Sequence, residues 1–464
     1  MKELLGMKKH NHWRSGLLIL GATVLLAGGG AAGTGIGMPR AEVDAATSVT
    51  QLSYPAGTVT TAANNRVPLA DRLIAPASAV IAYTTGNPAV AKVNEKGVLL
   101  PVAPGRTTIT VKAFTDEGAS SMSLPVVVTA AKPLAGKATY ASRRVNAGGR
   151  TFTVHTVTVP KGTPVTAGLA SRQVGSAQSL TAIAAAYRAD TAINGTFFEA
   201  YNGTPDPYGN VISNGIPAHI GNTGTTVGFR WDGTAVMDTL RLGIAGSVAN
   251  EKGPRSWYAY FLNRTPVSDT TATLFTPARG SRIGFAAEKA IIVRSGAVVR
   301  IARGENAAIP ADGFVIVFAG KESGQADRFQ VGAKVDYTFT YRNDAGKELD
   351  WSDVHTAIGA GPRLVKDGKI AVDPAAEGFK DPKILTGGGA RSGIAILKNG
   401  SVMLATVPGA TMKQWALIMQ QLGAAQAMNL DGGASSGLLT GGKTVTTPGR
   451  ALSNALVFGA NLKW

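Results

Sequence analysis

Two segments of the chain repeat one pattern, an amphipathic helix followed by a short apolar strand that ends in polar residues and glycine. In the first segment, apolar residues at helical spacing from Leu180 to Tyr187 precede a strand that ends at Asn194. In the second, an apolar stripe from Trp415 to Leu422 precedes a strand that ends at Asn429. Residues 225–345 between them are rich in strand patterns. We therefore expect an α+β fold, with a mixed sheet and a few packed helices.

The N-terminal part, residues 48–130, has the short alternating strands and regular turns of a small β-sandwich. It resembles a bacterial Ig-like domain of the Big-2 type. The resemblance rests on Asn87–Val93, Gly97 and the strand Gly105–Val111. It implies a spacer or adhesion module, joined by a linker at residues 131–139 to a larger domain at 140–464.

Residues 1–45 have the pattern of a secretory signal peptide. Basic residues precede an apolar run from Leu17 to Ala27, and Val43-Asp44-Ala45 offers a cleavage site with small residues. The run of about 11 residues is shorter than the roughly 20 needed to span a bilayer. We expect a cleaved signal, with an uncleaved anchor as the alternative. The expected location is secreted or attached to a bacterial cell wall or surface, with membrane contact only through this segment.

The charge balance predicts an anionic partner. The chain carries 46 Lys and Arg against 29 Asp and Glu, a net charge of +17, and no Cys. An excess of this size favours binding to polyanions, but the basic residues are scattered and no nucleic-acid motif is present. We therefore expect a phosphate-bearing glycan or an anionic cell-wall polymer, and no nucleic acid. The alternative is a basic surface with no specific partner.

The loop Asn429-Leu430-Asp431-Gly432-Gly433 is the strongest candidate for chemistry. A polar side chain stands at the end of a strand, and glycine lets the backbone approach a ligand closely. The alternative is a simple turn, because Asp-Gly is a favoured turn dipeptide. Asn194-Gly195 repeats the same arrangement, which favours a site.

These residues are similar to the phosphodiester glycosidase family, of the N-acetylglucosamine-1-phosphodiester alpha-N-acetylglucosaminidase type. The resemblance covers about residues 140–464. Its ordered pieces are Ile193–Phe198, Gly209–Gly215, Ala357–Gly368, Arg391–Ala395 and Asn429–Ser436, with Arg450 and Asn454 behind them. The chain departs from the family at Thr196 and Ala434, where Gly is usual, and at Gly437, where Thr is usual.

The resemblance implies hydrolysis between the anomeric carbon of a sugar and a phosphate oxygen. Asp431 is the expected carboxylate near the oxocarbenium-like centre. Arg391 is the expected guanidinium for the phosphodiester, which suits bidentate contact, and Asn194 completes the catalytic set. The expected substrate-binding residues are Asn429, Gly195, Gly432, Gly433, Ser435, Glu199, His219 and Gly361.

A second acid and a metal are open questions in the sequence. Glu199 and Asp206 are candidates for a second carboxylate, with a solvated loop acid as the alternative for both. His219 and His355 are candidates to line the site, whereas His155 lies in an alternating strand and is expected to be structural. No cluster has metal-ligand spacing, so no metal site is predicted, although Ca²⁺ or Mg²⁺ held by scattered oxygens stays possible. Two other functions stay open, a non-catalytic protein that binds cell-wall glycan and a metal-dependent phosphodiesterase.

Overall fold

The computed structural model describes residues 52–63, 65–76, 79–115, 118–130, 136–250, 253–351 and 353–463. The expected signal peptide, residues 1–45, lies outside the described residues, as do residues 131–135 of the expected linker. Across the described ranges, no helix is long and apolar enough to cross a membrane.

The prediction of an α+β fold is wrong, because the structure is mostly β-sheet, with 49% strand and 11% helix. The two predicted helices are present as α1 (Leu180–Ala186) and α3 (Met412–Gln421), but they are short. A further helix, α2, spans only Pro382–Leu385. Nearly all the strand pairs are antiparallel, and antiparallel strands can be joined by tight hairpins without crossover helices. Two helical patterns were therefore too little evidence for a mixed architecture.

The N-terminal β unit consists of two small sheets. The four-stranded sheet has the order β1-β7-β6-β3 and the three-stranded sheet has the order β2-β5-β4. Leu99, Ile109 and Leu124 from the two sheets are buried in one core. The Ig-like assignment of this unit stays a prediction. The strands are β1 (Val59–Ala62), β2 (Val67–Pro68), β3 (Val80–Thr85), β4 (Ala91–Val93), β5 (Val98–Pro101), β6 (Gly105–Thr115) and β7 (Gly118–Thr129).

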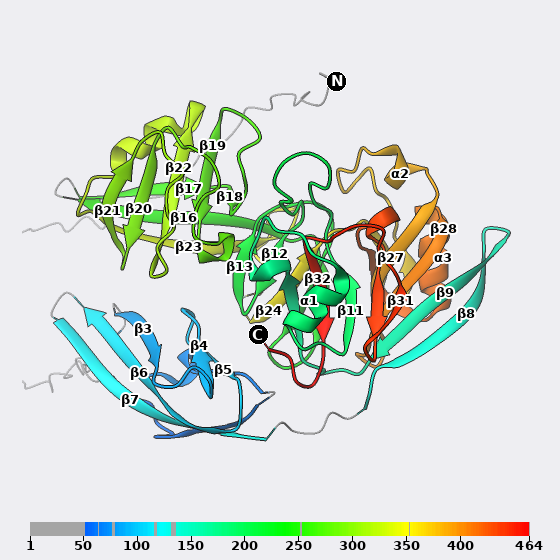
Figure 1. Cartoon of the computed structure of the whole chain (residues 1–464), viewed down its shortest axis with the longest axis horizontal. Helices are drawn as coiled ribbons and strands as arrows, with labels where there is room; N and C mark the ends of the chain where they lie inside the picture. Colours follow the sequence, from blue (N-terminus) through cyan, green and yellow to red (C-terminus); the bar gives the residue numbers. More distant parts are fainter. Residues whose placement is uncertain are drawn as a thin grey trace, which may run out of the picture. The chain divides into compact units, whose positions relative to one another are not determined.

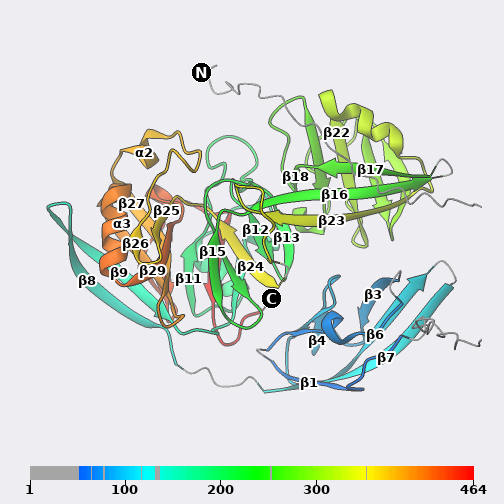
Figure 2. The same ribbon diagram turned by 180° about the vertical axis from the view of Figure 1, so that it is seen from behind.

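A seven-stranded sheet of order β26-β25-β29-β27-β28-β9-β8 contains the strand that leads into the Asp431 loop. Helix α3 covers it with Trp415, Ile418 and Met419, all fully buried, and Figures 1 and 2 show the helix lying against these strands. Thr411 begins α3 with a capping box. The strands are β8 (Thr139–Ala147), β9 (Arg150–Val159), β25 (Arg363–Lys366), β26 (Lys369–Ile370), β27 (Gly389–Leu397), β28 (Val402–Ala410) and β29 (Ala424–Asn429).

A five-stranded sheet of order β10-β32-β11-β30-β31 contains the other predicted site strand, β11. Helix α1 packs on it through Leu180 and Ile183, as Figure 1 shows. Ser179 begins this helix by accepting a hydrogen bond from the backbone N–H of Ala182. The strands are β10 (Val165–Leu169), β11 (Thr191–Asn194), β30 (Leu438–Thr440), β31 (Lys443–Thr446) and β32 (Asn454–Phe458).

A second five-stranded sheet of order β13-β12-β24-β14-β15 shares its core with the two sheets above. Ile193, Ile358 and Met428, one from each of the three sheets, are fully buried in the same cluster. This common core fixes the ends of β11, β24 and β29 relative to one another. The strands are β12 (Val211–Ser213), β13 (Ile216–His219), β14 (Thr226–Arg230), β15 (Ala235–Asp238) and β24 (Val354–Gly359).

An eight-stranded sheet of order β17-β16-β23-β21-β20-β22-β19-β18 is inserted between β15 and β24. Its strands include buried apolar runs, such as Ala290–Arg294 and Gly313–Ala319, which explain the strand patterns within residues 225–345. The strands are β16 (Arg241–Asn250), β17 (Gly253–Ala259), β18 (Phe261–Leu262), β19 (Thr271–Phe275), β20 (Ala290–Arg294), β21 (Ala297–Ala302), β22 (Gly313–Ala319) and β23 (Lys334–Arg342).

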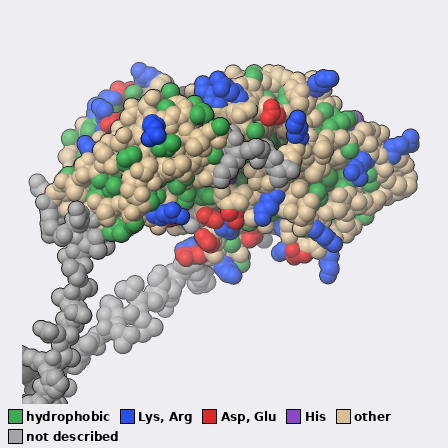
Figure 3. Space-filling view, turned by 90° about the horizontal axis from the view of Figure 1, so that it is seen from below, with side chains coloured by type: hydrophobic (Ala, Val, Ile, Leu, Met, Phe, Trp, Pro, Cys, Tyr) green, Lys and Arg blue, Asp and Glu red, His purple; other side chains and the backbone are tan. Residues whose placement is uncertain are grey.

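The surface in Figure 3 has Lys and Arg side chains scattered over it. They do not form the continuous stripe that typifies a nucleic-acid groove on the face shown there. A dispersed positive charge attracts polyanions without fixing one binding path.

Candidate active site

The structure brings together the two loops that the sequence singled out. Strand β11 ends at Asn194 and strand β29 ends at Asn429, and the residues that follow them contact each other. The side-chain amide of Asn194 donates to the carbonyl oxygen of Asp431 at 2.7 Å. The backbone N–H of Asp431 donates in turn to the carbonyl oxygen of Gly195 at 3.1 Å. Asp431 is thus held between two strand ends from distant parts of the chain.

Asn194 shapes this loop with both ends of its amide. Its Nδ2 bonds Asp431, and its Oδ1 accepts a hydrogen bond from the N–H of Gly437 at 3.0 Å. The side chain is only 1% exposed. A buried amide whose donor and acceptor both bind backbone has little capacity left for a substrate. The contribution that the structure assigns to Asn194 is therefore to hold the segment from Asp431 to Gly437.

Two of the predicted glycines are required by close backbone packing. A Cβ on Gly195 would lie 1.9 Å from Oδ1 of Asn454, which accepts the N–H of Thr196 at 3.0 Å. A Cβ on Gly432 would lie 2.7 Å from the carbonyl oxygen of Ala390. These two glycines allow the Asp431 loop to lie directly against its neighbours.

Asp431 has the electrostatic environment of a functional acid. Burial raises its pKa from 3.8 to about 6, against the opposing effects of a hydrogen bond from Ser435, the N–H of Gly432 and the cation Arg450. The N–H of Gly432 donates to Oδ1 of Asp431 at 2.9 Å. A carboxyl group with a pKa of about 6 is suited to acid–base or nucleophilic work. Ser435 and Gly432, both predicted to bind substrate, contact this carboxylate instead.

Arg391 lies beside the loop but is largely occupied. Its Nε donates to the carbonyl of Ala410 at 2.8 Å, and its Nη2 donates to the carbonyls of Lys383 and Gly387 at 2.8 and 2.7 Å. The side chain is 3% exposed, and burial lowers its pKa. Nη1 lies 3.7 Å from the position of a Cβ on Gly432. Only Nη1 is left to face the loop, so the bidentate contact expected of Arg391 is not available.

Asn429 and Gly361 form a second contact between strand ends. Nδ2 of Asn429 donates to the carbonyl of Gly361 at 3.1 Å, and the N–H of Gly361 donates to the carbonyl of Asn429 at 3.0 Å. Asn429 is fully buried, and among the described residues its Oδ1 has no hydrogen-bond partner. The pair fixes the start of the Asp431 loop against β25.

Glu377 has a carboxylate close to Gly361, and the sequence analysis did not single it out. Its Oε2 accepts from the hydroxyl of Thr225 at 2.8 Å and lies 2.9 Å from the position of a Cβ on Gly361. Its Oε1 accepts from the N–H of Arg363 at 2.5 Å. Burial raises its pKa. The only signal in the sequence was its position shortly after the matched segment Ala357–Gly368, because the loop has no periodic pattern.

Glu199 is not placed as a second acid facing Asp431. Its Oε1 accepts from the N–H groups of Tyr201 and Asn202, each at 3.0 Å, and its Oε2 accepts from the hydroxyl of Tyr208 at 2.9 Å. These hydrogen bonds lower its pKa. The carboxylate therefore ties its own loop together through partners that are all close to it in the sequence.

The predicted histidines and Asp206 lie in other surroundings. His219 is fully buried, and burial lowers its pKa to about 4, against the opposing charge of Asp206. Asp206 is 6% exposed and paired with buried Arg279, so it is no solvated loop acid. His355 is buried in β24, and the Nδ1 of His155 contacts the hydroxyl of Tyr140. Within the described ranges, no three His, Asp or Glu side chains gather to hold a metal ion.

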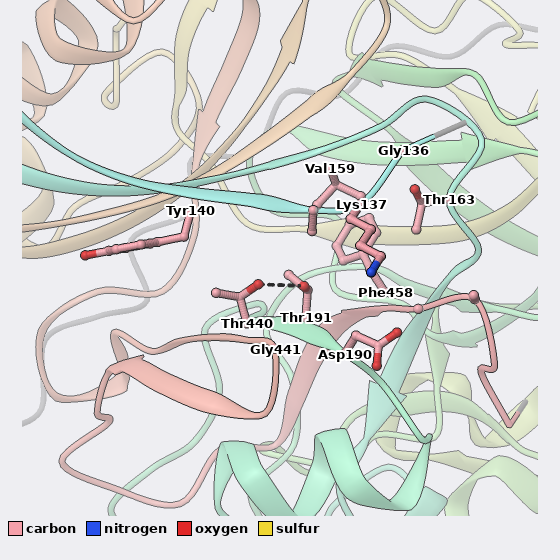
Figure 4. A pocket seen from close by; sticks show the side chains of 13 residues that line it. Gly136, Lys137, Tyr140, Val159, Thr163, Asp190, Thr191, Thr440, Gly441 and Phe458 are labelled. Atoms are coloured by element: carbon pink, nitrogen blue, oxygen red, sulfur yellow. Dashed lines mark hydrogen bonds between the residues drawn. The ribbon is translucent and has the colours of Figure 1, made fainter. Parts of the chain in front are cut away.

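A cavity of about 880 Å³ lies at the opposite end of β11 (Figure 4). Thr191 and Thr440 line it and bond each other at 3.1 Å, and its charged lining residues are Lys137 and Asp190. Since Thr191 begins the strand and Asn194 ends it, the cavity is separate from the Asp431 loop. The hydroxyls of Thr191 and Thr440 are paired with each other, and the hydroxyl of Thr163, which also lines the cavity, donates to the carbonyl of Pro160 at 2.8 Å.

One departure from the family pattern has a structural explanation. A Cβ on Gly437 would lie 2.4 Å from Cγ of Pro448 and 3.0 Å from Leu180. The Pro448 ring therefore occupies the space that a larger residue at position 437 would need. By contrast, the hydroxyl of Thr196 is buried, and no described residue bonds it.

Comparison with known proteins gives a partial family match. Residues 288–459 match the family model of phosphodiester glycosidases, a range that contains Glu377, Arg391, Asp431 and Arg450. The match points to a hydrolase that acts on a glycan phosphodiester. Among proteins with curated functions, none matches the sequence.

Solved structures show the fold. A hypothetical protein from Synechocystis is 23% identical over 83% of this chain and 81% of its own, with a TM-score of 0.61. A putative exported protein from Burkholderia pseudomallei is 16% identical over 82% of this chain and 97% of its own, with a TM-score of 0.55. The auto-inhibited catalytic domain of zebrafish N-acetylglucosamine-1-phosphodiester alpha-N-acetylglucosaminidase is 14% identical over 69% and 82%, with a TM-score of 0.36, too low to support an argument.

Proposed function

We propose that this protein hydrolyses sugar-1-phosphodiester bonds and that Asp431 is its central catalytic residue. One observation carries the proposal. Two strand ends hold a carboxylate with a pKa of about 6 within the electrostatic influence of Arg450, and Nη1 of Arg391 lies close to the neighbouring residue Gly432. An acid beside cations suits a substrate that joins a sugar to a phosphate. The match to phosphodiester glycosidases over residues 288–459 supports the same reaction.

In the proposed reaction, the bond between the anomeric carbon and the phosphate oxygen breaks. The phosphomonoester leaves with the bonding electron pair, the oxygen of a water molecule becomes bonded to the anomeric carbon, and one proton is released. Asp431 in its ionised form stabilises the positive charge that develops at the sugar ring. Arg391 Nη1 and the Arg450 guanidinium stabilise the negative charge on the departing phosphate. A phosphate leaves readily, which reduces the need for an acid at the leaving oxygen.

We extend the proposal to a substrate on a cell-envelope or exopolysaccharide glycan, reached by a secreted or surface-attached protein. The net charge of +17 supports a polyanionic substrate. The resemblance of residues 48–130 to an Ig-like spacer supports attachment or adhesion outside the cell.

The test compares turnover of two compounds by the purified chain, an N-acetylglucosamine-1-phosphodiester and a plain aryl glycoside. We expect turnover of the phosphodiester, insensitivity to EDTA, and loss of activity by roughly 10²–10⁴-fold in Asp431→Asn. Oxygen from labelled water is expected in the sugar, and its appearance in phosphate would overturn the proposal.

The second candidate function is a protein that binds cell-wall glycan without turnover. Absence of turnover of both compounds, together with unchanged glycan binding in Asp431→Asn, would favour that candidate. Loss of turnover in EDTA would favour a metal-dependent phosphodiesterase.

A further inference from the structure

The loop 199–208, here called the arm, is closed on itself by hydrogen bonds between its two ends. The N–H of Glu199 donates to the carbonyl of Asp206 at 3.0 Å. The N–H of Tyr208 donates to the carbonyl of Phe197 at 2.8 Å. The Glu199 carboxylate binds N–H and hydroxyl donors within the arm. Contacts at the base and the tip of the arm therefore determine where it lies.

A buried ion pair anchors the base of the arm. The side chains of Asp206 and Arg279 are only 8% and 4% exposed. One carboxylate oxygen of Asp206 accepts from Nη1 of Arg279, and the other accepts from the N–H of Thr265 at 2.7 Å. Arg279 also donates to the hydroxyl of Thr265 at 2.7 Å and to the carbonyl of Asn263 at 3.1 Å. Because both oxygens of the carboxylate have directed partners, its orientation is fixed.

Both of these partners of Asp206 come from the inserted eight-stranded sheet. Thr265 follows β18, and Arg279 ends the turn Pro277–Arg279 that follows β19. The same region of the sheet is bonded to the rest of the domain, since Nδ2 of Asn263 donates to the carbonyl of Ala218 at 2.8 Å. These residues lie outside the range 288–459 that matches phosphodiester glycosidases.

The tip of the arm contacts Arg450. Tyr201 is 75% exposed, and its hydroxyl accepts from Nη2 of Arg450 at 3.0 Å. The guanidinium carbon lies 4.9 Å from the centre of the Tyr201 ring, within the range of a cation–π contact. Arg450 in turn lowers the pKa of Asp431, although burial has the larger, opposite effect. The arm thus connects the inserted sheet to a cation that acts on Asp431.

We propose that the inserted sheet positions the active site through the arm. Asp206 and Arg279 hold the base of the arm, and both are positioning residues. Tyr201, at the tip, keeps Arg450 within the distance at which its charge acts on Asp431. A buried ion pair by itself is weak evidence for stability, because both charges lose their hydration, whereas its directed hydrogen bonds suit it to fix the arm. This inference rests on the proposed function and adds residues from outside the family match.

The test measures hydrolysis of an N-acetylglucosamine-1-phosphodiester by the full chain over a range of pH. Asp206→Asn removes the charge that pairs with Arg279, and we expect kcat/KM to fall roughly tenfold because the arm is misplaced. We also expect the acid limb of kcat/KM to move to higher pH. The reason is that Arg450 is held less firmly and therefore lowers the pKa of Asp431 less.

A double variant tests whether Asp206 acts through the arm. Tyr201→Ala removes the contact between the arm and Arg450. In that background Asp206→Asn is expected to change kcat/KM by less than about twofold, because the two substitutions interrupt the same connection. An equal loss in both backgrounds would show that the ion pair only stabilises the fold, and it would overturn the proposal. So would the absence of any loss in the wild-type background.

The matched control is an exposed ion pair on the same inserted sheet. Asp312 pairs with Arg294, and the two side chains are 45% and 58% exposed. Asp312→Asn is expected to leave kcat/KM and its pH dependence unchanged. A fall as large as that in Asp206→Asn would contradict a specific role for the buried pair.

Hydrogen exchange distinguishes failure of the anchor from failure of the proposed function, because it requires no turnover. Asp206→Asn is expected to raise the exchange rates of the N–H groups of Tyr201 and Asn202 about tenfold, and Asp312→Asn to leave them unchanged. Equal exchange in Asp206→Asn and the wild type would overturn the anchor even in an active hydrolase. Faster exchange in a chain that hydrolyses no phosphodiester would support the anchor and refute the proposed function.

A second variant keeps the proposal testable if Asp206→Asn does not fold. Thr265→Val removes the hydroxyl that accepts from Arg279 and leaves both charges in place. We expect about threefold effects on kcat/KM and on exchange in the arm, in the same directions. No change in either measurement would contradict the proposal.

Discussion

The site has a buried floor and an open rim that use the same kinds of side chain differently. The floor consists of Asn194, Arg391 and Asn429, each at most 3% exposed, and their polar groups bond mainly backbone atoms. The rim consists of Tyr201, which is largely exposed, and Arg450, which is partly exposed, and half-buried Asp431 lies between floor and rim, with a pKa that burial raises. Arg391 on the floor and Arg450 on the rim show the difference most clearly, since three donors of the first are used on carbonyls and only one donor of the second on a hydroxyl.

The difference has a simple physical cause. Leaving a buried polar group unpaired costs about 1–3 kcal/mol, and most polar atoms of the floor are hydrogen-bonded accordingly, although Oδ1 of Asn429 has no partner among the described residues. The floor residues therefore determine the course of the backbone, and the rim residues keep capacity for a ligand. Functional residues and positioning residues cannot be separated by residue type alone.

The largest effect that tests this comparison is on stability. Arg391→Met leaves the carbonyls of Ala410, Lys383 and Gly387 without their donor, and we expect the free energy of unfolding to fall by about 3 kcal/mol or more. Arg450→Met on the rim is expected to change it by only about 0.5 kcal/mol. Urea unfolding of both variants measures the difference. Equal losses in the two variants would remove the distinction between floor and rim.

A smaller stability effect is expected for the amide that joins the two loops. Asn194→Ala leaves the Asp431 carbonyl and the Gly437 N–H unpaired, and we expect a loss of about 2 kcal/mol together with reduced turnover. Asn202→Ala, at an exposed position in the neighbouring loop, is the control. Reduced turnover with unchanged unfolding would instead indicate direct contact between Asn194 and the substrate.

The sequence predicted the centre of the site better than it predicted the fold class or the residues around that centre. Asn194 and Asp431 could be paired because each follows an apolar strand and precedes glycine, and such local patterns are readable. The partners of Arg391 could not be found, because they are backbone carbonyls of β28 and the α2 region that no spacing relates to it. Glu377 and Tyr201 lie on aperiodic loops whose position depends on tertiary contacts. The predicted fold class was wrong for a related reason, because the two clear helical patterns were given more weight than the many short strand patterns.

The smallest expected effect is a shift in the pH dependence of kcat/KM. It tests how burial and the charge of Arg450 together set the pKa of Asp431. Its pKa is raised from 3.8 to about 6, so the ionised fraction increases as the pH rises through 6. If the ionised form is active, kcat/KM is expected to fall about tenfold for each pH unit below 6 and to be constant above it. Arg450 lowers this pKa, so Arg450→Gln is expected to move the acid limb to higher pH, whereas Arg294→Gln leaves it in place. If kcat/KM of the wild type instead falls only below about pH 4, the pKa of Asp431 is close to its ordinary value of 3.8. The carboxyl group would then be solvated in the working enzyme, and burial would not affect it.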